Sequence, residues 1–355
     1  MPRTTLYVVA PRAVAVRTDP IPDPQPHQVR VRTTYSAISP GTELLVYRGE
    51  APEAAGDEAI DPVTGRIEYP IAYGYSAVGV VEAVGREVDA AWEGRRVFGF
   101  QPHTSHFCCA PDALVPLPEA LADRDAVLLP NVETAVNLVM DGRPVLGERV
   151  LVLGQGVVGL LTTALLARFP LELLATTDRY AARRAMSLDL GADRALDPAD
   201  PATDRWLCEA LDTQASPPKH GYGADLLFEL TGQPAALDDA LRYAGFESRI
   251  VVGSWYGTRR APVNLGAKFH RHRIRLVSSQ VSTVASRWRG RWDKARRMRT
   301  AMAWMRAIRP ARLITHVTSL DDAGEAFRLL DESPQEAIQI VFSYDATHET
   351  SARDV

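Results

Sequence analysis

Hydrophobic and polar positions alternate in short runs over the first 125 residues of the chain. The clearest runs are QVRVRTTYSAIS at 28–39, AVGVVEAVG at 77–85 and RRVFGF at 95–100. Alternation with a period of two, broken by glycine and proline, is typical of half-buried strands joined by turns. We therefore predict a β-barrel-like domain here, with a surface loop at 51–70, where acidic residues, Pro and Gly follow no period.

The pattern changes after a helix-like stretch at 126–143. From about residue 148 to 277, apolar segments of strand length alternate with segments whose apolar residues recur at helical spacing. The expected strands are 148–154, 171–178, 224–232 and 248–254, and the expected helices between them are 160–169, 181–192 and 234–244. Strand–helix alternation over this length predicts a parallel, doubly wound sheet. A helix at 319–334 and a strand at 337–344 are expected to follow.

One apolar run, LVLGQGVVGLLTTALLA at 151–167, has nearly the length of a membrane span. Its glycines cluster at one point and Gln155 lies among them, so a strand, a tight turn and a buried helix explain it better. We expect no membrane contact. A signal peptide is not expected either, because Pro11 and Arg12 interrupt the apolar run near the N-terminus.

The composition fits a globular protein of two domains, with 355 residues, 46% hydrophobic residues, 24% charged residues and a net charge of −4. The acidic balance argues against a general nucleic-acid binder. Cys108, Cys109 and Cys208 are too few for a disulfide framework. We interpret them as reduced thiols of a cytoplasmic protein.

A glycine-rich motif, GQGVVG from Gly154 to Gly159, lies between the expected strand ERVLVL and an expected helix. In that context Gly154 permits the tight turn, Gly156 lets a pyrophosphate approach the backbone, and Gly159 lets helix and strand pack closely. Val157 and Val158 open the helix, whose N-terminal amides would face the phosphates. The alternative is that these glycines only shape a turn.

The next expected strand ends at Asp178. An acidic residue there can accept hydrogen bonds from both ribose hydroxyls of NAD and would repel the 2′-phosphate of NADP. Arg179 keeps NADP open as the alternative, because its guanidinium could hold that phosphate if Asp178 turned away. Further cofactor contacts are expected from Thr231, Gly253 and Ser254, at the ends of two later strands.

The order of these parts resembles the medium-chain dehydrogenase/reductase superfamily over nearly the whole chain. The stretches that carry the resemblance are PIAYGYSAVGVVEAVG, GERVLVLGQGVVGLL, MSLDLGAD and DLLFELTG. The stretch YSAISPGTELLVYRG looks most like the branch that includes bacteriochlorophyllide dehydrogenases. The resemblance implies a GroES-like β-barrel catalytic domain formed by residues 1–130 and 278–355, and a Rossmann dinucleotide-binding domain formed by 131–277. It also implies a pyridine-nucleotide oxidoreductase, with its active site in the cleft between the domains, and a homodimer.

The superfamily's zinc motif is present only in outline. Its first cysteine ligand falls near Ser39, and its histidine falls at Tyr75. The glutamate after that histidine falls at Ser76, and the third ligand falls near Leu129. These side chains do not supply three or four donors that converge on one metal ion, and two adjacent cysteines cannot supply the superfamily's four-cysteine structural zinc lobe. We therefore predict no zinc.

Without a metal, hydrogen-bond donors must stabilise the charge that develops on the reacting oxygen. The candidates are Ser39, Thr42, Tyr75 and His103. Thr42 falls near the superfamily's proton-relay hydroxyl, and Tyr75 replaces a ligand that pointed at the metal. Tyr75 could equally be a packing residue with its hydroxyl on a backbone carbonyl. His103 and His106 could be hydrogen-bonded structural histidines, and the sharper hypothesis is that His103 faces the cleft as the acid or base.

A basic segment at 268–299 stands out in the acidic chain, with eleven Lys or Arg residues and one acid, Asp293. Arg287, Trp288 and Trp292 could form a cleft wall for an anionic or planar substrate, through the guanidinium fork and ring stacking. Nucleic-acid binding and a solvated basic face near a subunit contact are the alternatives.

The sequence thus favours a zinc-independent, NAD(H)-dependent alcohol dehydrogenase or ketone reductase that acts on a small metabolite. The second interpretation is an enoyl or quinone reductase that uses NADPH, and Asp178 argues against it. The third is a non-enzymatic nucleotide-sensing or RNA-binding protein that keeps the fold for its cofactor site.

Overall fold

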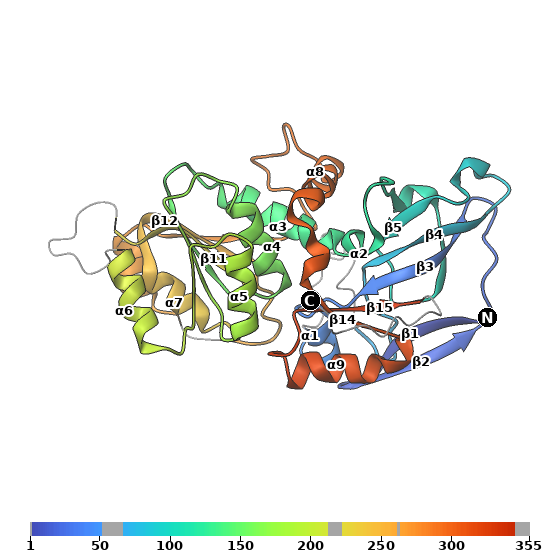
Figure 1. The fold of residues 1–355 in the computed structure, drawn as a ribbon, viewed down its shortest axis with the longest axis horizontal. Helices are drawn as coiled ribbons and strands as arrows, with labels where there is room; N and C mark the ends of the chain where they lie inside the picture. Colours follow the sequence, from blue (N-terminus) through green and yellow to red (C-terminus); the bar gives the residue numbers. More distant parts are fainter. Residues whose placement is uncertain (1, 52–66, 212–221, 261–262, 345–355) are drawn as a thin grey trace.

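The computed structural model describes residues 2–51, 67–211, 222–260 and 263–344. Two sheets lie one after the other along the long axis of the molecule, and helices separate them (Figure 1). Most of the loop expected at 51–70 lies outside the described residues.

The first sheet has six parallel strands in the order β10-β9-β8-β11-β12-β13. These strands are β8 (Arg149–Leu153), β9 (Leu173–Thr177), β10 (Arg194–Leu196), β11 (Ala224–Glu229), β12 (Ala244–Val252) and β13 (Arg275–Ser278). The helices along this part of the chain are α4 (Val157–Leu166), α5 (Ala181–Asp189), α6 (Pro201–Ala210) and α7 (Ala236–Tyr243). The strand order 3-2-1-4-5-6 is that of a doubly wound dinucleotide-binding sheet, so the expected fold class is confirmed.

Alternate residues of β8 point to opposite faces of this sheet, as strand geometry requires. Val150 and Val152 belong to a buried cluster that includes Leu166 of α4. Leu151 and Leu153 belong to another buried cluster, which includes residues of α6 and α7. Both faces of the sheet are therefore covered by helices. This explains why the parallel strands are unbroken apolar runs in the sequence.

The second sheet has the order β14-β15-β3-β4-β5-β7, with β6 paired to β3. Its strands are β3 (Val29–Ala37), β4 (Ala77–Val84), β5 (Arg96–Gly99), β6 (His106–Cys109), β7 (Leu114–Pro116), β14 (Ile314–Thr318) and β15 (Gln339–Ser343). A hairpin of β1 (Arg3–Ala10) and β2 (Ala13–Asp19) and the helices α1 (Glu43–Arg48) and α9 (Ala323–Glu332) complete this part. The C-terminal segment therefore returns to the sheet built by the N-terminal part of the chain.

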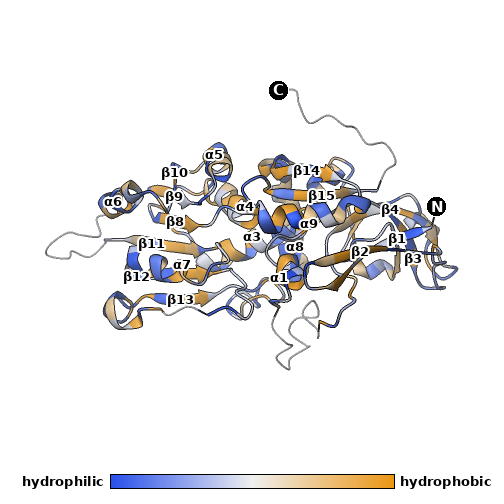
Figure 2. Ribbon diagram, turned by 90° about the horizontal axis from the view of Figure 1, so that it is seen from below, coloured by the Kyte–Doolittle hydropathy of each residue, from blue (hydrophilic) through white to orange (hydrophobic). Residues whose placement is uncertain are grey.

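Three helices lie between the two sheets (Figure 1), namely α2 (Asp123–Ala126), α3 (Leu129–Gly142) and α8 (Lys294–Ile308). Figure 2 shows α3 and α8 in the same central place from another side. One buried cluster combines Phe98 of β5, Leu160 of α4 and Met305 of α8. The two halves of the molecule thus share a core through these helices. The domain boundaries expected after residues 130 and 277 fall in the first turn of α3 and near the end of β13, and they stay a prediction.

The apolar run at 151–167 forms the end of β8, the glycine-rich turn and α4. Across the described ranges, no helix is both long enough and apolar enough to cross a membrane.

Candidate active site

Ser39 and Tyr75 are in contact, and the Tyr75 hydroxyl donates a hydrogen bond to Ser39 Oγ. Ser39 follows β3 and Tyr75 precedes β4, and these two strands are antiparallel neighbours. Ser39 is buried and Tyr75 is half-buried. The sheet therefore brings together two of the predicted catalytic residues and leaves the tyrosine partly accessible.

The buried carboxylate of Glu43 fixes the Ser39 side of this pair. Its Oε1 accepts a hydrogen bond from the Ser39 backbone N–H at 2.8 Å, and its Oε2 lies 2.8 Å from His103 Nε2. The side chains of Glu43 and His103 are only 2% and 1% exposed. A buried carboxylate is tolerated when it is hydrogen-bonded and paired, so these contacts fix the turn that carries Ser39. Sequence reasoning missed Glu43, because nothing in SPGTE distinguishes a buried acid from a helix-capping one.

His103 lies in the interior, which corrects the expectation that it faces the cleft as an acid or base. Its Nδ1 lies 2.7 Å from Ser36 Oγ, which is 2.9 Å from the hydroxyl of Tyr344. Gly74 makes room for the ring, since a Cβ there would lie 3.0 Å from His103 Cδ2. Both ring nitrogens are engaged inside the protein, as the alternative of a structural histidine expected. His106 is also a partnered side chain, 3.0 Å from Ser105 Oγ, and burial lowers its pKa.

The other positions that correspond to the superfamily's zinc ligands, Ser76 and Leu129, are buried inside the protein. Ser76 is buried and donates its hydroxyl to the carbonyl of Val127, and Leu129 is fully buried at the start of α3. Thr42 is half-buried at the start of α1, where its side chain makes no capping hydrogen bond. In the part of the chain that the structure describes, no three His, Cys, Asp or Glu residues are grouped to hold a metal ion.

The cysteines of β6 are free thiols. Cys108 is half-buried, and Cys109 is buried. Burial raises the pKa of Cys109 to about 11 and that of Cys108 above its usual value. Among the described residues, no third His, Cys, Asp or Glu side chain is grouped with this pair to complete a metal site.

The three glycines of the glycine-rich turn differ in the space around them. Gly154 has a φ of +90°, and a Cβ there would lie 2.7 Å from the backbone of Leu230. A Cβ at Gly159 would lie 2.0 Å from the Gly154 carbonyl oxygen, so helix and strand need this glycine to approach. At Gly156 the space is open, and the nearest atom to a Cβ would be Arg183 Nη1 at 3.9 Å. Val157 begins α4 without a side-chain cap, which leaves its N-terminal amides for a ligand.

Asp178 lies beside this turn, at the end of β9. Its Oδ2 accepts a hydrogen bond from the Gln155 backbone N–H at 2.7 Å, and its Oδ1 accepts one from the Tyr180 backbone N–H at 2.8 Å. The side chain of Arg179 is exposed and makes no hydrogen bond or ion pair with the described residues. Asp178 is therefore held towards the turn, with lone pairs left for further donors.

Arg183, in α5, is a cationic side chain at the turn that sequence reasoning missed. Its Nη2 donates to the carbonyls of Pro334 and Ala337 at 2.8 and 3.0 Å, and its Nη1 approaches Gly156. Burial lowers its pKa, although Asp178 opposes that shift. Arg183 thus links the segment before β15 to the glycine-rich turn, and it could hold a phosphate there. The sequence could have indicated Arg183, because it lies five residues after Asp178 and in the first turn of the next helix.

A second polar group lies at the end of β11. Glu229 is fully buried, and its Oε1 accepts a hydrogen bond from the Thr231 backbone N–H at 2.8 Å. Its Oε2 accepts one from the Tyr256 hydroxyl at 2.5 Å. Burial, followed by the bond to Glu229, raises the pKa of Tyr256 far above its usual value. An acidic residue inside the apolar strand LLFEL was the signal for this buried carboxylate.

The other two predicted cofactor positions lie beside this group. Ser254 Oγ accepts a hydrogen bond from the Gly232 backbone N–H at 2.9 Å, which joins the loops after β11 and β12. A Cβ at Gly253 would lie 2.6 Å from the side chain of Leu138, so α3 packs directly against the end of β12. Thr231, Gly253 and Ser254 thus gather at the carboxyl ends of neighbouring strands, where doubly wound folds bind ligands.

Arg287, Trp288 and Trp292 lie in the connection between β13 and α8. Arg287 is exposed, and each tryptophan ring faces an arginine of the same segment, at 5.3 Å for Arg291 and Trp288 and at 4.2 Å for Arg296 and Trp292. Among the described residues, no hydrogen bond or ion pair joins the three predicted substrate residues to Ser39 or Tyr75. A substrate-binding role for this segment stays a prediction.

Two family models match the chain. One describes the alcohol dehydrogenase GroES-like domain and matches residues 25–114, and the other describes a zinc-binding dehydrogenase and matches residues 157–298. Together they cover more than half of the chain.

The chain is also similar over almost its full length to individual proteins. It is 23% identical to the starvation-sensing protein RspB of Escherichia coli K12, over 96% of this chain and 99% of RspB. It is 24% identical to 2-desacetyl-2-hydroxyethyl bacteriochlorophyllide A dehydrogenase of Cereibacter sphaeroides, over 97% of this chain and 99% of that protein. The crystal structure of rspB from Escherichia coli CFT073 in complex with NADH superimposes with a TM-score of 0.77 at 20% identity, covering 96% of this chain and 99% of that chain.

The open space at Gly156 generates a prediction. Gly156→Ala places a methyl group where a pyrophosphate would approach, in backbone geometry that alanine adopts without strain. We expect the dissociation constant for NADH, measured by fluorescence titration, to rise about tenfold or more, with little change in Tm. Gly290→Ala, at another glycine with open space, is the matched control. Equal NADH affinity in Gly156→Ala and wild type would contradict this assignment of the turn.

Proposed function

The chain belongs to the medium-chain dehydrogenase/reductase superfamily of NAD(P)-dependent oxidoreductases, and we propose that it is a zinc-independent member that uses NAD(H). In this proposal it interconverts an alcohol and a ketone of a small metabolite where its two domains meet. The observation that carries the proposal is the hydrogen-bonded Ser39–Tyr75 pair, which takes the positions of two zinc ligands. The non-enzymatic alternative has no support in this family membership.

Zinc does not fit the side chains at the ligand positions. Ser39 Oγ accepts a hydrogen bond from the Tyr75 hydroxyl, and neither a serine hydroxyl nor a phenol is among the Cys, His and carboxylate donors that hold zinc. Leu129 offers no donor, and the Ser76 hydroxyl is committed to a backbone carbonyl. A catalytic zinc needs three protein donors around one point. We therefore derive no step that involves a metal.

Tyr75 is the proposed donor to the substrate oxygen. When bound, the nicotinamide supplies or accepts the hydride. The phenol of Tyr75 is half-buried, and its hydroxyl proton points to Ser39 Oγ. In the proposed step this proton turns to the substrate oxygen that becomes an alkoxide, and the Ser39 hydroxyl turns to donate its own proton to the Tyr75 oxygen. Glu43 and His103 act behind this pair as positioning residues, because they fix the backbone of Ser39 and contact no accessible surface.

The contacts of Asp178 support NAD over NADP. Binding of a 2′-phosphate by Arg179 was the alternative, and it required Asp178 to turn away. Two backbone N–H groups, from Gln155 and Tyr180, oppose that rotation. The carboxylate remains where it can accept the ribose hydroxyls and repel a phosphate. The proposal of a cytoplasmic location rests on the reduced cysteines and stays a prediction.

The proposed activity can be tested by steady-state oxidation of NADH and NADPH with a panel of small ketones and aldehydes. We expect turnover with at least one carbonyl compound and a kcat/KM for NADH about tenfold or more above that for NADPH, because of Asp178. Reduction of enones or quinones with NADPH, and none of ketones, would instead establish the enoyl or quinone reductase.

Tyr75→Phe tests the proposed donor. We expect kcat to fall about tenfold or more, given the ~10²–10⁴ that a positioned proton donor contributes. The matched control is Tyr69→Phe, which removes another half-buried hydroxyl, bonded to the Val46 carbonyl. If both variants keep kcat within about twofold of wild type, Tyr75 is a packing residue and the proposed mechanism is wrong.

We also propose a homodimer, in which β13 of two copies meet. β13 is an end strand of its sheet, so its outer edge has no partner strand among the described residues, and Leu276 on it is 39% exposed. Such an edge can pair with a second copy. Light scattering should give twice 38.9 kDa for wild type and 38.9 kDa for Leu276→Pro, which removes an edge N–H. A monomeric wild type would end this proposal.

A further inference from the structure

A stripe of buried polar side chains runs along α3, among many apolar ones. Glu133, Asn137 and Asp141 are spaced four residues apart and so share one face. They are buried, with 6%, 4% and 6% of their surface exposed. Buried polar groups on a helix need partners, and the stripe finds them in the segment between β13 and α8.

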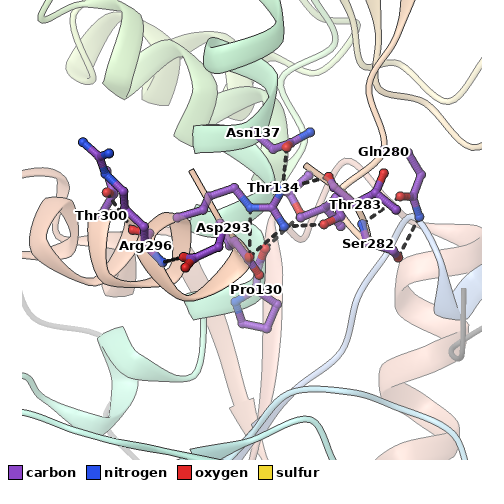
Figure 3. Close-up of polar contacts among 12 residues, drawn as sticks. Pro130, Thr134, Asn137, Gln280, Ser282, Thr283, Asp293, Arg296 and Thr300 are labelled. Carbon is purple, nitrogen blue, oxygen red and sulfur yellow. Dashed lines mark hydrogen bonds and ion pairs between the residues drawn. The ribbon is translucent and has the colours of Figure 1, made fainter. Parts of the chain in front are cut away.

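Arg297 of α8 is the principal partner, and its side chain is only 1% exposed. Its Nε and Nη2 lie 3.0 and 2.9 Å from Glu133 Oε1. Its Nη1 donates to Asn137 Oδ1 at 2.6 Å and to the Thr283 carbonyl at 3.1 Å, and its Nη2 donates to the Val281 carbonyl (Figure 3). Four hydrogen bonds and the ion pair therefore engage all three nitrogens of the guanidinium. Arg297 joins two helices and the β13–α8 connection at one point.

The network continues to the ends of two strands. Asn137 Nδ2 donates to Ser279 Oγ at 2.9 Å, and Ser279 Oγ donates to Asp141 Oδ2 at 2.8 Å. The backbone N–H of Ser279, directly after β13, donates to the carbonyl of Val252, the last residue of β12. The contacts of Arg297 are thus linked to the backbone at the carboxyl ends of β12 and β13.

This location determines which half of the cofactor the network borders. In a 3-2-1-4-5-6 sheet each half binds one mononucleotide of a dinucleotide, at the carboxyl ends of its strands. The half formed by β8, β9 and β10 carries the glycine-rich turn and Asp178, where the adenosine part binds. The half formed by β11, β12 and β13 remains for the nicotinamide part. Leu138, next to Asn137, packs directly against Gly253 of this second half.

We propose that Arg297 is a positioning residue for the nicotinamide half of the cofactor, an inference that rests on the proposed function. Together with Glu133 and Asn137 it fixes the backbone after β13 against α3, and so preorganises the surface that the nicotinamide occupies. A buried ion pair contributes less to stability than well-packed apolar side chains of similar volume. All three guanidinium nitrogens of Arg297 have partners, so the pair holds the segment after β13 in one geometry, and we infer that this geometry is its role.

The experiment compares the binding of NADH and of ADP-ribose, which lacks the nicotinamide, by calorimetry. The test variant is the double substitution Arg297→Met with Glu133→Met, which leaves no unpaired buried charge. The matched control is Arg249→Met with Glu148→Met, because this pair is also largely buried and lies at the opposite end of the strands. Ser279→Ala, which removes one hydroxyl, is a milder second variant. Circular dichroism and Tm establish folding.

We expect the test variant to bind NADH about tenfold or more weakly and ADP-ribose within about twofold of wild type, with a smaller loss of the same kind in Ser279→Ala. The control pair should alter Tm and neither affinity. Equal losses for both ligands, or no loss for either, would overturn the inference. If the double variant does not fold, unchanged NADH affinity in Ser279→Ala would overturn it. Wild-type protein that binds neither ligand would overturn the proposed function itself, and this inference with it.

Discussion

The geometry of the candidate site depends on the two hydrogen bonds of the buried Glu43 carboxylate. One oxygen holds the backbone N–H of Ser39, and the other pairs with His103 in a region closed to solvent. Removing one partner of such a pair leaves an uncompensated group and is strongly destabilising. The pair therefore sets the position of Ser39, and through it that of the Tyr75 hydroxyl. In the proposed zinc-independent mechanism, a carboxylate, an imidazole and two hydroxyls perform the ordering that metal–ligand bonds perform in zinc enzymes.

A buried ion pair, Glu133–Arg297, lies where the two domains meet. α3 begins at Leu129, at the third outlined ligand position, and its polar stripe continues to the ends of β12 and β13. One helix thus connects the side that carries Ser39 with the half of the sheet left for the nicotinamide. Because Arg183 also spans both parts, at the glycine-rich turn, the two domains are joined by charged side chains at both halves of the proposed cofactor site.

Features that depend on neighbours in the chain could be predicted from the sequence, and features that depend on distant partners could not. The glycine-rich turn is local, and the roles of Gly154 and Gly159 agree with the space around them. The strand β13 was missed because an edge strand with Arg275 and Ser278 exposed lacks an apolar pattern. His103 was assigned to the cleft because its burial depends on Glu43, which lies 60 residues away in the chain. Glu133 and Arg297 are 164 residues apart. The only feature in the sequence that indicated their pairing is the helical spacing of the polar residues in α3.

The central claim is that protein hydroxyls, rather than a metal ion, stabilise the charge on the reacting oxygen. The most direct measurement is kcat before and after exhaustive chelation, with the metal content of the same sample determined by mass spectrometry. The account predicts unchanged kcat at about one metal atom per ten chains or fewer, because the hydroxyls of Ser39 and Tyr75 do not replace the Cys, His or carboxylate donors of a zinc site. Loss of kcat on chelation, restored by one equivalent of Zn²⁺ per chain, would contradict it.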